Sequence, residues 1–194
     1  MIECTLDLDD TSMNNDYVCE MLEEYQRVAD VRYTFGNSEG KIHAINRDMD
    51  KIDYDWDIVV VMSDDMKFVM EGFDEYIRAA FKTYGLDSVI HFNDGNVYGK
   101  DLMTLNVQGR DNYNRFGYLY NPEYKSLWCD NEQMEVGKIL GNYHYMGDNL
   151  VIVNHLHPAW VQGIQPDNLL KKTESFYSED EKTFNRRKSI NFGL

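Results

Sequence analysis

The chain has 194 residues, enough to bury one substantial core and within the usual size of a single domain. It carries 34 acidic and 19 basic residues, a net charge of −15, so its overall field repels phosphate backbones and anionic membrane surfaces. This argues against nucleic-acid binding, although a bound cation would still attract an anionic substrate. A hydrophobic content of 43% excludes a disordered chain.

The cysteines and apolar runs bear on the cellular compartment. Cys4, Cys19 and Cys129 have neither metal-finger spacing nor the even number of a disulfide framework. No stretch reaches the roughly 20 apolar residues of a membrane span, and the first residues do not form a signal peptide. We therefore expect a cytoplasmic protein without a membrane span.

In chain order, the first third of the sequence predicts strands that alternate with helices. Residues 1–8 predict a strand that ends in acidic residues, and residues 17–28 have the apolar spacing of one helical face. A strand at 31–34 is followed by a glycine-containing loop and a helix at 41–47. The strongest signal is the β-branched run 58–62, which predicts a strand buried on both faces of a mostly parallel sheet.

The rest of the chain continues this alternation. The predicted helices are 73–84 and 132–140, each closed by a glycine, and the predicted strands are 88–92, 102–107 and 150–153. We expect one α/β domain over 1–174 with a mostly parallel central sheet flanked by helices, and a polar tail or packed helix over 175–194. Binding sites of such sheets lie at the carboxyl ends of the strands.

Asp64 and Asp65 directly follow the predicted strand at 58–62. Two adjacent carboxylates repel each other unless they share a cation or a proton. A hard divalent ion such as Mg²⁺ or Mn²⁺ would remove that cost and keep coordination positions open for phosphate oxygens. A solvated acidic turn is the alternative interpretation of the same residues.

Two further segments contain candidate residues. His155 and His157 stand two residues apart on an extended segment, so both side chains point to the same side and either could ligate a metal. Asp130 lies where a helix is predicted to begin, and the exposed N–H groups there would keep it ionised as a base. Structural or surface histidines and an ordinary N-cap are the alternatives.

Taken together over residues 2–160, these segments resemble the inverting nucleotide-sugar glycosyltransferases of the GT-A fold, family-two type. The resemblance places Asp64 and Asp65 in the metal motif, Asp130 at the catalytic base and a late histidine in the metal shell. For the donor nucleotide it implies contacts from Asp9, Asp10, Lys41 and Asn46. For the acceptor, the candidates are Asp94, Trp128 and Glu132, with a turn former and a core aromatic as alternatives for the first two.

The sequence departs from this family at two places. The metal motif is usually Asp-x-Asp, but its first position here is Ser63, which leaves Asp65 as the principal expected ligand. The chain also starts at what resembles the second strand of the family, so we expect the usual first strand and helix to be missing.

The resemblance implies transfer of a sugar, with inversion, from a nucleoside-diphosphate sugar to a carbohydrate or other hydroxyl acceptor, assisted by Mn²⁺ or Mg²⁺. Alternatives are a non-catalytic nucleotide-sugar or carbohydrate binding protein, a subunit that needs a partner chain to complete its site, and a structural acidic subunit. Each of these is compatible with a homo-oligomer.

Overall fold

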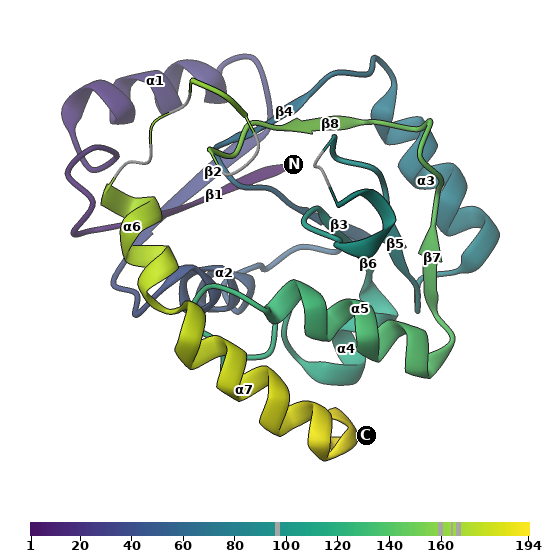
Figure 1. The fold of residues 1–194 in the computed structure, drawn as a ribbon. Coiled ribbons are helices and arrows are strands. Elements are labelled where there is room, and N and C mark those ends of the chain that lie inside the picture. Colours follow the sequence, from purple (N-terminus) through teal and green to yellow (C-terminus); the bar gives the residue numbers. More distant parts are fainter. Residues whose placement is uncertain (96–97, 159–160, 164, 166–167) are drawn as a thin grey trace.

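The computed structural model describes residues 1–95, 98–158, 161–163, 165 and 168–194, and the end of the resemblance near residue 160 lies outside them. The described chain is a mixed α/β structure with three small sheets (Figure 1). The first sheet pairs β1 (Ile2–Asp7) and β2 (Val31–Gly36) in parallel. Between them in sequence, α1 (Asp16–Gln26) packs Val18 and Leu22 against Leu6 of β1.

The second sheet has four strands in the order β3-β6-β5-β7. Their bounds are Ile58–Val61 for β3, Val89–His91 for β5, Asn106–Gly109 for β6 and Tyr143–Tyr145 for β7. Strand β6 is antiparallel to both β3 and β5, whereas β5 and β7 are parallel. The expected mostly parallel central sheet is therefore corrected to a mixed sheet, with β3 at one edge.

The third sheet is a short antiparallel ribbon of β4 (Met66–Phe68) and β8 (Val153–His155). Its register places Met66 opposite His155, and the amide of Leu156 donates to the carbonyl of Asp65 at 2.7 Å. This ribbon brings the segment after β3 beside the last strand, although the two are about ninety positions apart in the sequence.

Helices cover both faces of the four-stranded sheet. On one face, α3 (Phe73–Tyr84) packs Ile77 and Phe81 against β5, β6 and β8. On the other face lie α2 (Lys41–Met49), α5 (Cys129–Leu140) and α7 (Tyr177–Ser189). The remaining elements are α4 (Arg110–Phe116), α6 (Asn168–Ser175) and the short helical turns η1 (Gly99–Asp101) and η2 (Asn191–Gly193).

Several sequence predictions of single elements are confirmed. The helix at 73–84 is observed with the same bounds, and helices are observed near 17–28, 41–47 and 132–140. The strand at 58–62 is also observed, but its side chains are only partly buried because β3 is an edge strand. The described part of the chain has no helix long and apolar enough to cross a membrane.

Helix α7 is fixed to the domain by two buried charged residues. The carboxylate of Asp180 accepts hydrogen bonds from the amides of Lys125, Ser126 and Leu127 at 2.8–2.9 Å. Arg187 donates to both carboxylate oxygens of Glu132 in α5, at 2.7 and 2.8 Å. α7 therefore holds both the loop before α5 and α5 itself.

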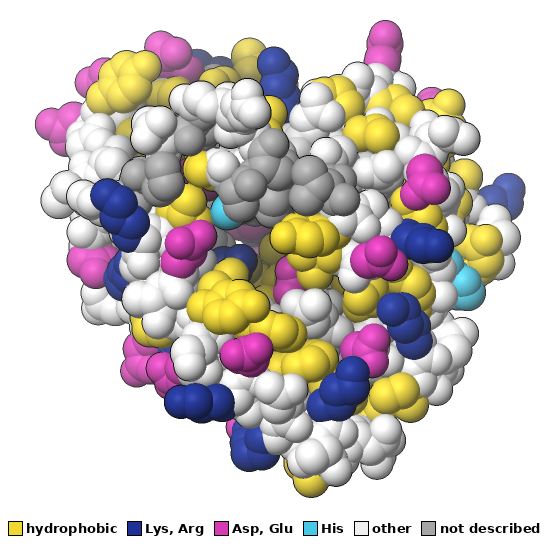
Figure 2. All heavy atoms as spheres, viewed as in Figure 1, with side chains coloured by type: hydrophobic (Ala, Val, Ile, Leu, Met, Phe, Trp, Pro, Cys, Tyr) yellow, Lys and Arg dark blue, Asp and Glu magenta, His cyan; other side chains and the backbone are white. Residues whose placement is uncertain are grey.

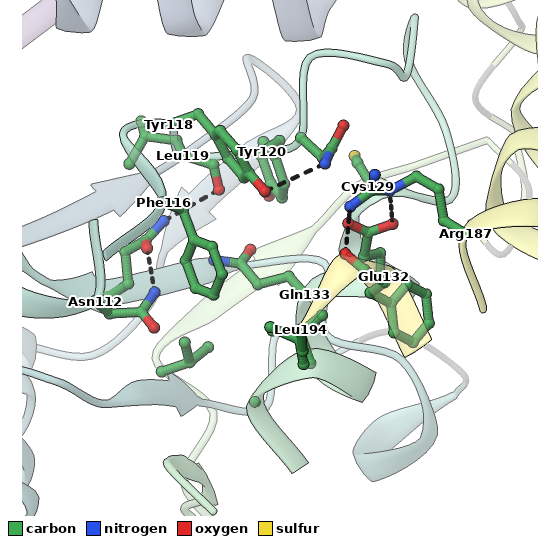
Figure 3. Close-up of a pocket in the computed structure, with 16 residues that line it drawn as sticks. Asn112, Phe116, Tyr118, Leu119, Tyr120, Cys129, Glu132, Gln133, Arg187 and Leu194 are labelled. Atoms are coloured by element: carbon green, nitrogen blue, oxygen red, sulfur yellow. Dashed lines mark hydrogen bonds and ion pairs between the residues drawn. The ribbon is translucent and has the colours of Figure 1, made fainter. Parts of the chain in front are cut away.

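A small cavity lies beside this ion pair, between α4, α5 and the C-terminal residues (Figure 3). Figure 3 shows the Arg187 guanidinium facing the Glu132 carboxylate, and Phe116 and Leu194 are also among the lining residues. The volume of about 30 Å³ has room for one or two water molecules and not for a substrate. This cavity is therefore a packing feature of the core. By contrast, the surface has an open hollow near the centre of the face seen in Figure 1 (Figure 2).

We expect Arg187→Ala to lower the free energy of unfolding by about 3–5 kcal/mol, because it leaves the buried Glu132 carboxylate without its partner. Arg186→Ala is the matched control: among the described residues, the ion-pair partner of Arg186 is the exposed Glu123, so the loss of stability is expected to stay below about 1 kcal/mol. Urea unfolding measures both. Equal losses in the two variants would contradict a special role for the buried pair.

Candidate functional site

The candidate site lies where two strands of the four-stranded sheet end. Because β3 and β5 are both antiparallel to β6, they run in the same direction and their carboxyl ends share one edge of the sheet. Asp65 follows β3, and Asp94 follows β5. Strand β8 adds His155 to the same edge through its pairing with β4. Polar residues thus gather at a carboxyl edge, despite the mixed direction of the sheet.

His155 lies between the two carboxylates. Its Nε2 atom is 3.2 Å from Oδ2 of Asp65, and its Nδ1 atom is 3.1 Å from Oδ2 of Asp94. The side chains of His155 and Asp94 are 8% and 1% exposed, whereas that of Asp65 is 28% exposed. The amide of His155 also donates to the carbonyl of Asp94 at 2.9 Å. The imidazole is therefore fixed in position, with Asp65 as the more accessible of its two acidic neighbours.

Two hydroxyl groups support the carboxylates. The Thr104 hydroxyl donates to Asp94 and lies 3.0 Å from Nδ1 of His155. The Ser63 hydroxyl donates to the other oxygen of Asp65. Each carboxylate thus has a fixed orientation through at least two partners.

The electrostatics of the cluster favour a positive charge on His155. Burial lowers the pKa of His155, but hydrogen bonds to Asp65 and Asp94 outweigh burial and raise the pKa to about 9. Burial raises the pKa of Asp65, but hydrogen bonds from His155 and Ser63 outweigh it and lower the pKa to about 2. The pKa of His157 is lowered, chiefly by burial. The cluster thus favours positive charge at His155 far more than at His157.

Asp130 lies within electrostatic range of this cluster. It is the second residue of α5, and its side chain is partly buried. Burial raises the pKa of Asp130, and the positive charges of Lys41 and His155 act against that rise. Lys41 is the first residue of α2, and Gly40 before it packs so closely on the carbonyl of Lys125 that a Cβ atom would not fit. This contact holds the start of α2 near the loop that leads to Asp130.

The other residues predicted for the donor nucleotide have different surroundings. Asp9 is exposed and pairs with Lys172 at 4.0 Å, and Asp10 accepts hydrogen bonds from Ser12. Asn46 donates to the carbonyl of Tyr120 at 2.7 Å and accepts from nearby amides. Asp64 is exposed next to Asp65. No observation tests a nucleotide contact by these residues, which therefore remains a prediction.

Of the residues predicted for an acceptor, Asp94 is instead a partner of His155, as described above. Glu132 is buried, and its carboxylate interacts with Arg187 and with the hydroxyl of Tyr124. Trp128 has a positive φ of 63°, rare for a residue other than glycine, and its indole packs edge-on against Tyr177. Its buried Nε1 has no hydrogen-bond partner among the described residues.

Sequence reasoning missed Thr104 and the role of Ser63 as a partner of Asp65. Thr104 fell inside the predicted strand 102–107, but the observed strand β6 begins only at Asn106. Threonine is common in strands, so its type alone carries no sign of a hydrogen bond to a site residue. Only the three-dimensional structure identifies it.

The cluster has the donor atoms for a divalent metal. In a carboxylate–histidine–metal arrangement, one ring nitrogen binds the ion and the other donates to a second carboxylate. Asp65 and Nε2 of His155 would be the ligands, with Asp94 as the second carboxylate. Among the described residues, no group of three or more histidine, cysteine, aspartate or glutamate side chains is placed to hold a metal ion.

No protein-family model matches the sequence, and neither a curated protein nor a solved structure matches the chain. The function is therefore inferred from the site.

We expect the stability of the metal-free protein to fall as the pH rises from about 6.5 to about 9. The pKa of His155 is raised in the folded state, so its stabilising contribution is complete below its ordinary value and is lost as the pH passes the folded value. The loss should be on the order of 3 kcal/mol. Unfolding in urea with EDTA over this pH range measures it.

The controls are His155→Gln, which should remove this pH dependence, and His157→Gln, which should leave it unchanged. An unaltered pH dependence in His155→Gln would show that the charge on His155 does not stabilise the fold.

Proposed function

We propose that this chain is a metal-dependent glycosyltransferase of the GT-A type, which transfers a sugar from a nucleoside-diphosphate donor to an acceptor hydroxyl with inversion. The observation that carries the proposal is the cluster at the strand ends. In it, Nε2 of His155 lies 3.2 Å from Oδ2 of Asp65, and Asp94 contacts the other ring nitrogen, Nδ1. The alternation of strands and helices around the carboxyl edge supports the same type of fold.

The donor atoms favour Mn²⁺ over Mg²⁺. Mg²⁺ prefers oxygen ligands and retains water, whereas Mn²⁺ also accepts an imidazole nitrogen. Asp65 and His155 would hold the ion, and the hydroxyl of Ser63 would orient the carboxylate. When bound, such an ion neutralises the diphosphate and stabilises the departing nucleoside diphosphate.

Other side chains would accept the proton, bind the phosphate groups and orient His155. Asp130 accepts the proton of the acceptor hydroxyl as that oxygen attacks the sugar, and its burial makes it a stronger base than an exposed aspartate. Lys41 is the first residue of α2, where its ammonium group and the positive end of the helix dipole both attract phosphate oxygens. Asp94 and Thr104 keep the imidazole of His155 directed at the metal ligand position.

The acceptor would approach beside Trp128. This residue precedes α5, two positions before Asp130, and its strained backbone is typical of positions kept for function. Its indole N–H is buried without a partner among the described residues and could donate to a sugar hydroxyl. Trp128 thus supports a carbohydrate acceptor.

We expect Mn²⁺ together with uridine or guanosine diphosphate to raise the melting temperature of the wild type, since a ligand at 100 times its Kd stabilises a fold by about 2.7 kcal/mol.

Asp65→Ala and His155→Ala should each weaken Mn²⁺ binding in calorimetry by at least about tenfold, in line with the loss of a metal ligand. The matched control is Asp64→Ala, which removes the neighbouring exposed carboxylate and should have a smaller effect. Equal Mn²⁺ affinity in wild type and Asp65→Ala would remove Asp65 from the site.

We expect Asp130→Asn to reduce sugar transfer by about 10²–10⁴-fold while nucleotide-sugar binding stays nearly unchanged, because the amide cannot accept the proton. Transfer is measured by release of nucleoside diphosphate, and binding by calorimetry. Glu135→Gln on the same helix is the control and should retain activity. Loss of donor binding in Asp130→Asn would instead assign Asp130 a structural role.

A further inference from the structure

We propose that the free edge of strand β3 binds an extended segment of a partner chain whose apolar centre is flanked by basic residues. The proposal stands on the geometry of β3 and on the charges around it in the metal-free protein, and it does not depend on sugar transfer.

The hydrogen-bond pattern shows which backbone groups of β3 face outward. The amide of Arg110 donates to the carbonyl of Asp57 at 2.8 Å, which extends the β3–β6 register by one pair and marks it as hydrogen-bonded. Hydrogen-bonded pairs alternate along an antiparallel ladder, so Val59 and Val61 also face β6. The backbone groups of Ile58 and Val60 therefore point away from β6, toward the free edge.

These outward groups have no backbone partner among the residues that the structure describes. The two faces of β3, in contrast, are covered. Ile58 and Val60 pack on the core between the sheet and α3, and Val61 packs on the core formed with α2, α5 and α7. Side chains thus cover both faces of β3 and β6 pairs with one edge, while no strand in the described part of the chain is hydrogen-bonded to the second edge.

The sequence of β3 lacks the devices that normally protect such an edge. Edge strands in soluble proteins commonly contain proline, lysine or an inward-pointing charge. Residues 58–61 are Ile-Val-Val-Val, which favour strand pairing and contain none of these. An unprotected apolar edge is what a binding site for an added strand requires.

The charges around β3 select the occupant. Before the strand stand Asp53, Asp55 and Asp57, and after it stand Asp64 and Asp65. Asp53, Asp55 and Asp65 pair with Arg32, Arg110 and His155, respectively, and these three positive groups offset three of the five acids, so the flanks keep a net negative charge. A second copy paired antiparallel through β3 would bring acids against acids, which disfavours a symmetric dimer. A strand with lysine or arginine at both ends would complement both acidic flanks.

The test uses a short synthetic peptide of alternating valine and threonine with lysines at both ends. Calorimetry at low salt measures binding, and amide hydrogen exchange by NMR locates it. In the free protein, the amides of Ile58 and Val60 should exchange faster than those of Val59 and Val61. The peptide should slow exchange at Ile58 and Val60 by at least tenfold, and its affinity should fall as salt is added.

Three matched controls make the result specific. A peptide with glutamates in place of lysines should bind at least tenfold more weakly, and one with N-methyl groups along one edge should not protect these amides. Val60→Pro removes only an outward N–H, leaves the β3–β6 bonds in place and should abolish binding. If this variant does not fold, Asp57→Lys, which reverses one flanking charge, should weaken binding instead.

Two outcomes would overturn the proposal. The first is absence of binding and of protection at millimolar lysine-ended peptide. The second is a dimer in light scattering with Ile58 and Val60 already protected, which would make a second copy the occupant.

Discussion

Two carboxylates share one histidine in this structure, and their closeness requires positive charge between them. Asp94 is almost completely buried, so its carboxylate needs hydrogen-bonding or charged partners inside the protein. A protonated imidazole or a metal ion beside His155 satisfies both acids at once. The strand directions make this possible, because β6 lies between β3 and β5 in the sheet and is antiparallel to both, so that β3 and β5 end at the same edge.

A different set of charges organises the start of α5. Asp180 binds three successive amides ahead of α5, and Arg187 neutralises Glu132 within that helix. α7 therefore fixes the place at which α5 begins, and with it Asp130. A polar C-terminal helix far along the chain thus helps to set the geometry of a residue that we assign to proton transfer.

The sequence allowed much of the local structure to be predicted and less of its assembly. The helix 73–84 was predictable because its apolar spacing and the glycine after it agree. The run at 58–62 was predictable as a strand, but its place at an edge was not, because apolar runs carry no information on neighbours. Strand direction was missed for the same reason. β4 and β7 have three residues each, too few for a periodicity to appear.

The candidate site was predictable at residues with a suitable side chain that directly follow a predicted strand. Asp65 and His155 were identified because each adjoins an apolar run, and the structure brings them together. The sequence left a polar tail or a packed helix open for residues 175–194, and the residues that anchor α7 were not identified because Asp180 and Arg187 are charged and give no hydropathy signal. Glu132 was assigned to an acceptor from its place beside Asp130, but which way a helical side chain points depends on partners such as Arg187 that lie elsewhere in the sequence.

The carboxylate of Asp180 also has a consequence for how the protein is made. It binds amides more than fifty positions earlier in the chain, so during translation the loop at 125–127 leaves the ribosome well before its partner does. Until residues 177–189 have been synthesised, the start of α5 lacks the contacts that fix it. The contacts that fix Asp130 therefore form only after residues 177–189 have emerged, later than the strands that position Asp65 and Asp94.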